Sequence, residues 1–212
     1  MTAAKTVTAI EIQKGRKNRV SVFLDHLFAF GIDQDVLVKA GIATGDQLSE
    51  ERIAAILEME ERHTAKQKAL RWLAVRDRSR KELETKLRMA KFAPATITWT
   101  LQELERLQLT NDTAFARSFS QNRMVTRPVG KRLLARELQQ KGLSETAIEQ
   151  GLEKAYENLT EEEVAKDLAQ KRKKSCLHLP EEKAKKRVAD FLLRRGFSWS
   201  IVEEILDNWN QY

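Results

Sequence analysis

Three pairs of adjacent basic residues are the side chains of this sequence best suited to chemistry, and that chemistry is the binding of anions. The pairs are Arg80-Lys81, Lys131-Arg132 and Lys185-Lys186. Each lies near the expected start of a helix, where positive charge opposes the helix dipole by a few tenths of a kcal/mol to about 1 kcal/mol. Helix stability therefore does not explain their placement. Because Lys and Arg bind phosphates and carboxylates alike, the pairs predict a nucleic acid or an acidic protein as the partner.

The candidate binding set has further members, and its third pair differs from the first two. Arginines beside predicted helix ends complete the set: Arg78, Arg127, Arg194 and Arg195. Pro180 indicates that the helix carrying the third pair begins early, which places Lys185 and Lys186 more than one turn inside it. The alternative interpretation of the whole set is a solvated basic face that only keeps the chain soluble.

Metal binding and catalysis have little support in the sequence. Cys176 and His178 lie two residues apart, but the chain has 1 cysteine and 3 histidines, and a zinc site normally takes three or four protein ligands. There is no G-x-S-x-G motif, no phosphate-binding glycine loop and no pair of carboxylates in a setting that would shift their pKa values. We therefore expect no metal, no cofactor and no catalytic residue.

Length and composition are those of a basic globular chain. It has 212 residues, a net charge of +7 and a pI of about 9.5, with 42% hydrophobic and 33% charged residues. This charge balance favours anionic partners. Cys176 cannot form an intramolecular disulfide, residues 1–13 lack the apolar run of a signal peptide, and no stretch approaches the roughly 20 apolar residues of a membrane span. We expect a cytoplasmic protein without a membrane partner.

The elements that position these side chains belong to a threefold repeat. Leu87, Leu138 and Leu192 can be superimposed at spacings of 51 and 54 residues. Other apolar positions then fall into the same register: Leu83, Leu134 and Val188; Phe92, Leu143 and Phe197; Ile97, Ile148 and Val202; Leu101, Leu152 and Leu206. A period of about fifty residues with helical spacing is typical of stacked helical units that cannot bury their apolar stripes alone.

The first part of the chain has a different pattern. Residues 6–13 and 19–24 show the period-two alternation of strands, with a polar turn between them, and a short turn then leads into an apolar segment at residues 27–30. We therefore predict a mainly α protein with five parts. They are a small β-hairpin or meander plus a short helix (1–45), an acidic connecting helix (46–64), and three-helix repeats at 65–110, 111–159 and 160–212.

Charge follows the same plan. The first two helices of each repeat are basic, with net charges of +7, +6 and +7 over residues 66–91, 117–141 and 166–195. Residues 142–163 carry −6 and residues 44–61 carry −5. If the repeats stack in register, the basic segments form one stripe suited to a polyanion or to an acidic groove.

Several motifs occur in an order and spacing that resemble the RecX family of recombinase regulators, over about residues 65–209. The motifs are Arg76-x-Arg78-Ser79-x-x-Glu82-Leu83-x-x-Lys86-Leu87, Asp112-x-x-Phe115-Ala116 with Arg123, Gly130-x-x-x-Leu134-x-x-Glu137-Leu138-x-x-Lys141-Gly142, and Phe191-Leu192-x-x-Arg195-Gly196-Phe197-Ser198. Two positions depart from the family pattern. Lys91 stands where a glycine is expected before the aromatic residue, and Asn111-Asp112 stands where paired acids are usual.

The resemblance implies a non-enzymatic regulator of RecA. Family members have tandem three-helix repeats in an elongated, curved body that docks in the groove of the RecA–DNA filament. They suppress its ATPase, strand-exchange and coprotease activities. We accordingly expect a monomer whose partner is the RecA filament, with single- or double-stranded DNA as a further partner. The alternative is a helical-repeat protein that binds nucleic acid by itself and acts by competition for DNA.

Overall fold

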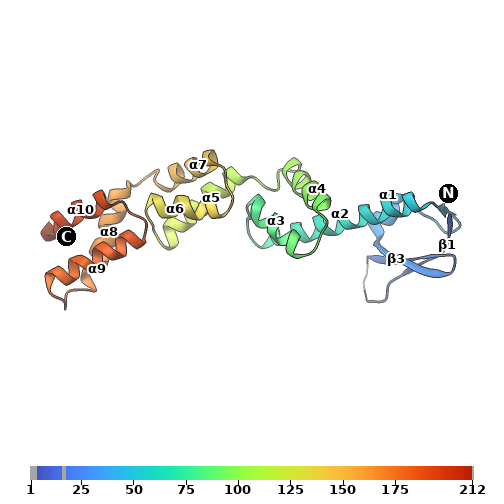
Figure 1. Ribbon diagram of the computed structural model, residues 1–212, viewed down its shortest axis with the longest axis horizontal. Helices are drawn as coiled ribbons and strands as arrows, with labels where there is room; N and C mark the ends of the chain where they lie inside the picture. The colour runs from blue at the N-terminus through green and yellow to red at the C-terminus, as the bar shows by residue number, and fades with distance from the viewer. Residues whose placement is uncertain (1–3, 16–17, 212) are drawn as a thin grey trace. The chain divides into compact units, whose positions relative to one another are not determined.

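The protein is mainly α-helical, as predicted, with a small antiparallel sheet at its N-terminal side (Figure 1). This computed structural model describes residues 4–15 and 18–211, so that residues 16–17 of the predicted turn lie outside the described residues. The strands are β1 (Lys5–Ile12), β2 (Arg19–Leu24), β3 (Leu27–Asp33) and β4 (Gln47–Leu48). None of the described helices combines the length and the apolar character that crossing a bilayer requires.

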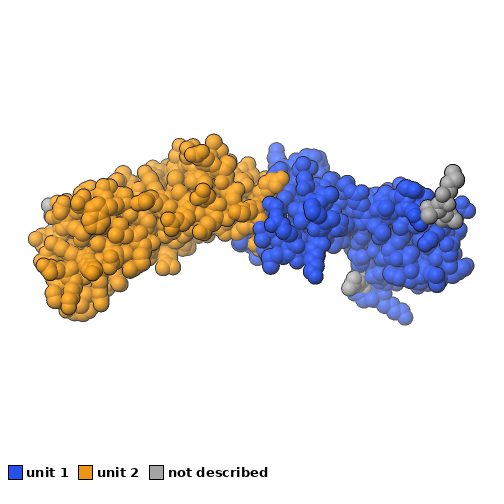
Figure 2. All heavy atoms as spheres, viewed as in Figure 1, with its two compact units in different colours: residues 1–76, 83–109 blue, residues 77–82, 110–212 orange. Residues whose placement is uncertain are grey.

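Ten α-helices are found in the described residues. They are α1 (Gln34–Ala40), α2 (Glu50–Val75), α3 (Arg80–Met89), α4 (Pro94–Arg106), α5 (Asp112–Thr126), α6 (Lys131–Gln140), α7 (Glu145–Ala155), α8 (Glu161–Lys174), α9 (Glu181–Arg194) and α10 (Trp199–Asp207), followed by a 3-10 turn at Trp209–Gln211. The chain forms two compact units (Figure 2). The first comprises residues 1–76 and 83–109, and the second comprises residues 77–82 and 110–212.

The sheet of the first unit has four antiparallel strands in the order β3-β2-β1-β4. Alternate residues of β2, namely Val20, Val22 and Leu24, face a core that also contains Ile32 and Ile56. The sequence predicted the first three strands but not β4, whose two residues pair with the start of β1. A strand of two residues is too short to show a period-two alternation, and therefore only the tertiary pairing reveals it.

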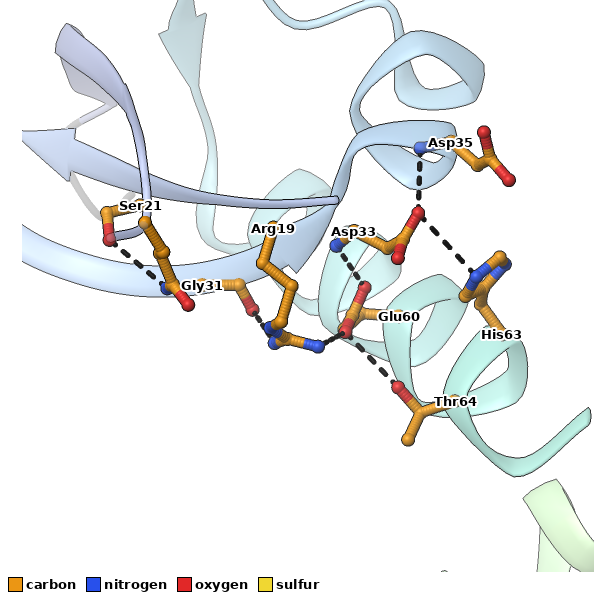
Figure 3. A network of polar contacts seen from close by, with 9 residues as sticks. Arg19, Ser21, Gly31, Asp33, Asp35, Glu60, His63 and Thr64 are labelled. Atoms are coloured by element: carbon orange, nitrogen blue, oxygen red, sulfur yellow. Dashed lines mark hydrogen bonds and ion pairs between the residues drawn. The ribbon is translucent and has the colours of Figure 1, made fainter. Parts of the chain in front are cut away.

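A buried carboxylate joins this sheet to α2 (Figure 3). Glu60 is 8% exposed, and its two oxygens accept hydrogen bonds from Arg19 Nη1 at 2.7 Å and from the backbone N–H of Asp33 at 2.8 Å. Thr64 Oγ1 donates a further bond to Glu60 at 3.2 Å. A buried charge is tolerated when it is paired and hydrogen-bonded, so this network fixes the sheet on the helix.

Helix α2 unites two segments that the sequence analysis treated as separate helices. It runs without interruption for 26 residues, from the predicted acidic connecting segment into the first helix of the first repeat. Its N-cap is Ser49, whose side chain accepts from the N–H of Arg52. No glycine or proline interrupts the chain near residue 64, where the predicted boundary lies. The backbone therefore continues as one helix.

The predicted register of the three repeats is confirmed by their cores. Two sets of matched residues are fully buried: Leu83, Leu134 and Val188, and Leu87, Leu138 and Leu192. Each repeat contributes its own apolar cluster. The last two repeats comprise the helices α5–α7 and α8–α10, which are labelled in Figure 1. The apolar stripes are therefore buried largely within their own three-helix units, contrary to the expectation that a unit cannot bury its stripe alone.

Two contacts in the second unit place the start of one middle helix against the end of the next. In the α3–α6 contact, Ser79 Oγ donates to the carbonyl oxygen of Lys141 at 2.7 Å, and Lys141 Nζ contacts Glu82 Oε1 at 2.6 Å. The methylenes of Lys81 lie against Gly142, where a Cβ would come within 2.3 Å of the Lys81 Cδ. This contact therefore consists largely of side chains.

In the α6–α9 contact, backbones meet directly. The Gly130 N–H donates to the carbonyl oxygen of Arg195 at 2.8 Å. A Cβ on Gly130 would lie 2.5 Å from the carbonyl carbon of Gly196, and one on Gly196 would lie 2.5 Å from the backbone nitrogen of Leu133. Since real Cβ atoms do not approach other atoms so closely, both glycines are required by the packing.

Candidate partner-binding surface

The first residues of two basic pairs are held by carboxylates of the next repeat. The backbone N–H of Arg80 donates to Asp112 Oδ1 at 2.9 Å, and that of Lys131 donates to Glu161 Oε1 at 2.8 Å. Asp112 and Glu161 are the first residues of α5 and α8. Each acid supplies the negative charge that a helix N-terminus favours. The first turn of α6 has no acid of its own, so the offsetting charge comes from outside that helix, whereas α3 also has Glu82 in its first turn.

The first residues of the second and third pairs have internal partners for their ammonium groups as well. Lys131 Nζ lies 5.3 Å from the centre of the Tyr156 ring. Lys185 Nζ is 2.8 Å from Glu181 Oε1 and 5.9 Å from the centre of the Trp209 ring. As predicted, the third pair lies inside its helix, since α9 begins at Glu181. These two lysines therefore have structural roles before any partner arrives.

The second residues of the three pairs point to solvent. Lys81, Arg132 and Lys186 are exposed, and within the part of the chain that the structure describes their charged groups make no hydrogen bond or ion pair. Neighbouring helical residues point about 100° apart, so one member of a pair can contact its own fold while the other remains available. The exposed set is therefore the stronger candidate for a partner.

The four additional arginines divide in the same way. Arg195 is a structural residue, because its Nη1 donates to the carbonyl oxygen of Pro128 at 2.5 Å and its guanidinium lies 4.9 Å from the centre of the Phe191 ring. Burial, together with the nearby positive charges of Arg127 and Arg123, lowers the pKa of Arg195. Arg127 and Arg194 are exposed and Arg78 is half-buried.

A groove between α6 and α9 contains Arg136, which is not among the predicted binding residues. Arg136 lies one turn after Arg132 on α6, and both face a depression of about 220 Å³ together with Arg194. Its remaining lining includes Leu133, Leu193 and Phe197. We call this depression the α6–α9 groove. Arg132 and Arg136 are four residues apart and therefore lie on one face of α6. This spacing is the feature of the sequence from which Arg136 could have been predicted as a binding residue.

Among the residues that the structure describes, one group of possible metal ligands comes together. Cys176 is buried and His178 is exposed. Asp33, Asp35 and His63 bring ligand atoms within 4.8 Å of one another. However, Asp33 Oδ1 already accepts from the N–H of Asp35 at 2.9 Å, as the N-cap of α1, and lies 3.7 Å from His63 Nε2 (Figure 3). That cluster is explained by helix capping.

Family models match the chain in four successive segments. They are the RecX N-terminal domain at residues 5–49, and the first, second and third three-helix domains of RecX at residues 65–104, 111–152 and 160–206. The chain belongs to the RecX family. Two RecX relatives, both described as regulatory protein RecX, are each 32% identical to it. The one from Bacillus licheniformis aligns over 94% of this chain and 76% of its own length, and the one from Bacillus subtilis over 95% and 76%.

Solved RecX structures have the same fold. A crystal structure of regulatory protein RecX matches with a TM-score of 0.75 and 30% identity, covering 96% of this chain and 99% of that one. A crystal structure of RecX from Lactobacillus salivarius matches with a TM-score of 0.64 and 26% identity, covering 73% of this chain and 99% of that one. The RecX three-helix domains and the N-terminal strands of this chain are thus those of its family.

Proposed function

We propose that this chain is a non-catalytic regulator of RecA recombinase that acts in the cytoplasm as a monomer. It docks along the groove of the RecA–DNA filament and suppresses ATP hydrolysis, strand exchange and coprotease activity. The observation that carries the proposal is the presence of all four RecX domains in succession along one chain. The absence of a catalytic constellation from the sequence motifs is in keeping with a binding role.

The arrangement of charge supports docking on a repetitive partner. Lys81, Arg132 and Lys186 occupy matched positions of successive repeats and point to solvent. A filament presents the same acidic or phosphate groups many times, so weak contacts from several repeats add through effective concentration. The candidate interface therefore includes these three residues together with Arg127 and Arg194, while Arg80, Lys131, Lys185 and Arg195 position the helices. Arg78 remains in the candidate set.

The deciding experiment is single-stranded-DNA-dependent ATP hydrolysis by RecA, titrated with this protein and repeated with DNA in large excess over both proteins. We expect suppression at substoichiometric ratios in both formats, because the filament is the target. Suppression that disappears with excess DNA would instead indicate competition for strands, which is the alternative function. No suppression in either format would refute the proposal.

A charge-reversal variant tests which cations are responsible. The triple substitution Lys81→Glu, Arg132→Glu and Lys186→Glu is expected to raise the concentration needed for inhibition at least about tenfold, because each reversal turns an attraction into a repulsion. The matched control reverses three other exposed cations of the second unit, Lys174, Lys183 and Arg187, none of which has an internal polar partner in the described chain. Circular dichroism should show the same helix content in the two variants, and the melting temperature of the first reports the loss of the Lys81 packing against Gly142. Equal loss of inhibition in both would mean that net charge alone matters.

A further inference from the structure

The α6–α9 groove combines three guanidinium groups with an aliphatic floor. Arg132, Arg136 and Arg194 are exposed, and within the described residues none of them makes a hydrogen bond or an ion pair. Guanidinium groups bind carboxylates and phosphates through two parallel hydrogen bonds, and Arg is favoured wherever planar anions are recognised. Three unpaired arginines around one depression are therefore a preformed receptor for anions.

The floor of the groove favours a peptide over a nucleic acid. Leu193 is 40% exposed although its neighbour Leu192 is fully buried, so it offers an aliphatic contact beside the arginines. Single strands are bound by stacking bases on aromatic faces. Phe197 is the aromatic residue of the lining, and it is only 1% exposed. The groove thus offers aliphatic contacts and no accessible ring.

Charge along the groove points the same way. A second depression continues from Arg132 and Arg136 along α6 and reaches Glu145 at the start of α7. A nucleic-acid backbone carries a charge at every nucleotide and would be repelled by this carboxylate. A peptide can place its acidic residues at the arginines and a neutral or basic residue beside Glu145.

We propose that the α6–α9 groove binds a short acidic peptide segment that carries one bulky aliphatic side chain. Its carboxylates bind Arg132, Arg136 and Arg194, and its aliphatic side chain packs on Leu193. This site goes beyond docking on RecA, because it specifies the chemistry of a single bound segment whichever protein supplies it.

The test uses the intact protein without RecA or DNA. The probe is a fluorescent peptide of about ten residues, made of Asp and Glu with one central Leu, and binding is followed by anisotropy. We expect Arg136→Glu to raise the Kd at least about tenfold. The control Arg187→Glu makes the same change of net charge at an exposed position of α9 outside the groove, and it should change the Kd less than about twofold.

A second comparison isolates the aliphatic contact. Replacing the central Leu of the peptide with Ser should weaken binding to the unaltered protein severalfold but should not weaken binding to the Leu193→Ser variant. The reason is that the effects of two substitutions do not add when the two side chains contact each other. Absence of binding, equal losses for Arg136→Glu and Arg187→Glu, or a Leu-to-Ser effect that persists in Leu193→Ser would each overturn the proposal. So would displacement of the peptide by an oligothymidine of equal charge at a lower concentration than by unlabelled peptide.

The outcome is distinguishable from that of the proposed function. If the peptide fails to bind while the protein still suppresses RecA ATP hydrolysis, the groove proposal fails and the regulatory function stands. If the peptide binds as expected while suppression is absent, the groove proposal stands and regulation of RecA fails.

Discussion

The α3–α6 and α6–α9 contacts occupy matched positions but are held by different chemistry. In the first, the buried hydroxyl of Ser79 bridges to a carbonyl group and the methylenes of Lys81 lie over Gly142. In the second, Gly130 replaces the serine and its backbone donates directly to Arg195. The comparison shows that the repeat preserves a geometry and not a residue type. The α3–α6 contact uses the side chain of Ser79, whereas the close backbones of the α6–α9 contact leave no room for a side chain at Gly130.

The left-handed residue after the middle helix makes the same point. Lys91, Gly142 and Gly196 hold matched positions, with φ angles of 63°, 78° and 85°. Gly142 and Gly196 are crowded by the preceding middle helix, whereas Lys91 is exposed. A glycine at position 91 would relieve only the strain of the positive φ angle, because the residue there is exposed. Lysine is therefore tolerated at this position, although it departs from the family pattern.

The largest effect is expected for Gly196→Ala. The new methyl group would meet the backbone of Leu133 and the residue has a positive φ, so the free energy of unfolding should fall by about 3–5 kcal/mol. Gly142→Ala has the same angular cost but meets a flexible lysine side chain, and about 1–2 kcal/mol is expected. Urea unfolding of both variants measures the difference. Equal losses of unfolding free energy would show that the backbones approach equally closely in the α3–α6 and α6–α9 contacts.

Ser79→Ala tests the polar bridge of the α3–α6 contact. It removes the donor to the Lys141 carbonyl and the acceptor for the Glu82 N–H, and the expected loss is about 2 kcal/mol. Ser144→Ala is the matched control, because Ser144 caps α7 in an exposed position and its loss should cost about 1 kcal/mol or less. If thermal or urea unfolding gave the same value for both, the bridge to Lys141 would contribute nothing beyond helix capping.

Lys91→Gly should stabilise the protein. A non-glycine residue in the left-handed region is strained, so glycine is expected to raise the free energy of unfolding by about 0.5–1 kcal/mol after its own entropic cost. Lys91→Ala keeps the strain and should give no gain. A destabilised Lys91→Gly variant in urea titrations would mean that the lysine side chain makes a contribution larger than the backbone strain.

The smallest effect concerns the carboxylate that caps α6. Burial raises the pKa of Glu161 and outweighs the hydrogen bond from the Lys131 N–H, so ionisation of this carboxyl lowers the stability. The contribution of Glu161 to stability is fully present below the ordinary pKa and is lost as the pH rises through the raised value. At pH 7 the Glu161→Gln variant should therefore melt up to about 2 °C higher than the unaltered protein, and at pH 4 the two should melt alike.

Glu163, in the same first turn of α8, provides a control of opposite sign. The hydrogen bonds from Thr160 lower the pKa of Glu163, so its contribution is present above the ordinary pKa and is lost as the pH falls. Glu163→Gln should accordingly melt lower at pH 7 than the unaltered protein and approach it at pH 3. Parallel pH profiles of melting temperature for the two variants would contradict both assignments.

The three repeats and the residues of their cores could be predicted from the order of the amino acids. Apolar spacing at Leu87, Leu138 and Leu192 was sufficient because helical burial follows the residue period. The caps Asp33 and Ser198 are equally local, since each side chain accepts from an N–H two or three residues further on. By contrast, the continuity of α2 was hidden by a change of charge, which marks a solvated face and not a break in the backbone.

Which cations are available to a partner depends on contacts that form only in the folded chain. Arg132 and Arg195 look alike in the sequence, yet the first points to solvent and the second bonds the carbonyl group of Pro128. The partners that make this difference lie far away along the chain, as do Asp112 and Glu161 for the helices that they cap. Arg136 entered the candidate site in the same way, through the approach of α9. The local pattern of residues therefore predicts the helices, whereas contacts between distant parts of the chain determine which charged groups remain available to a partner.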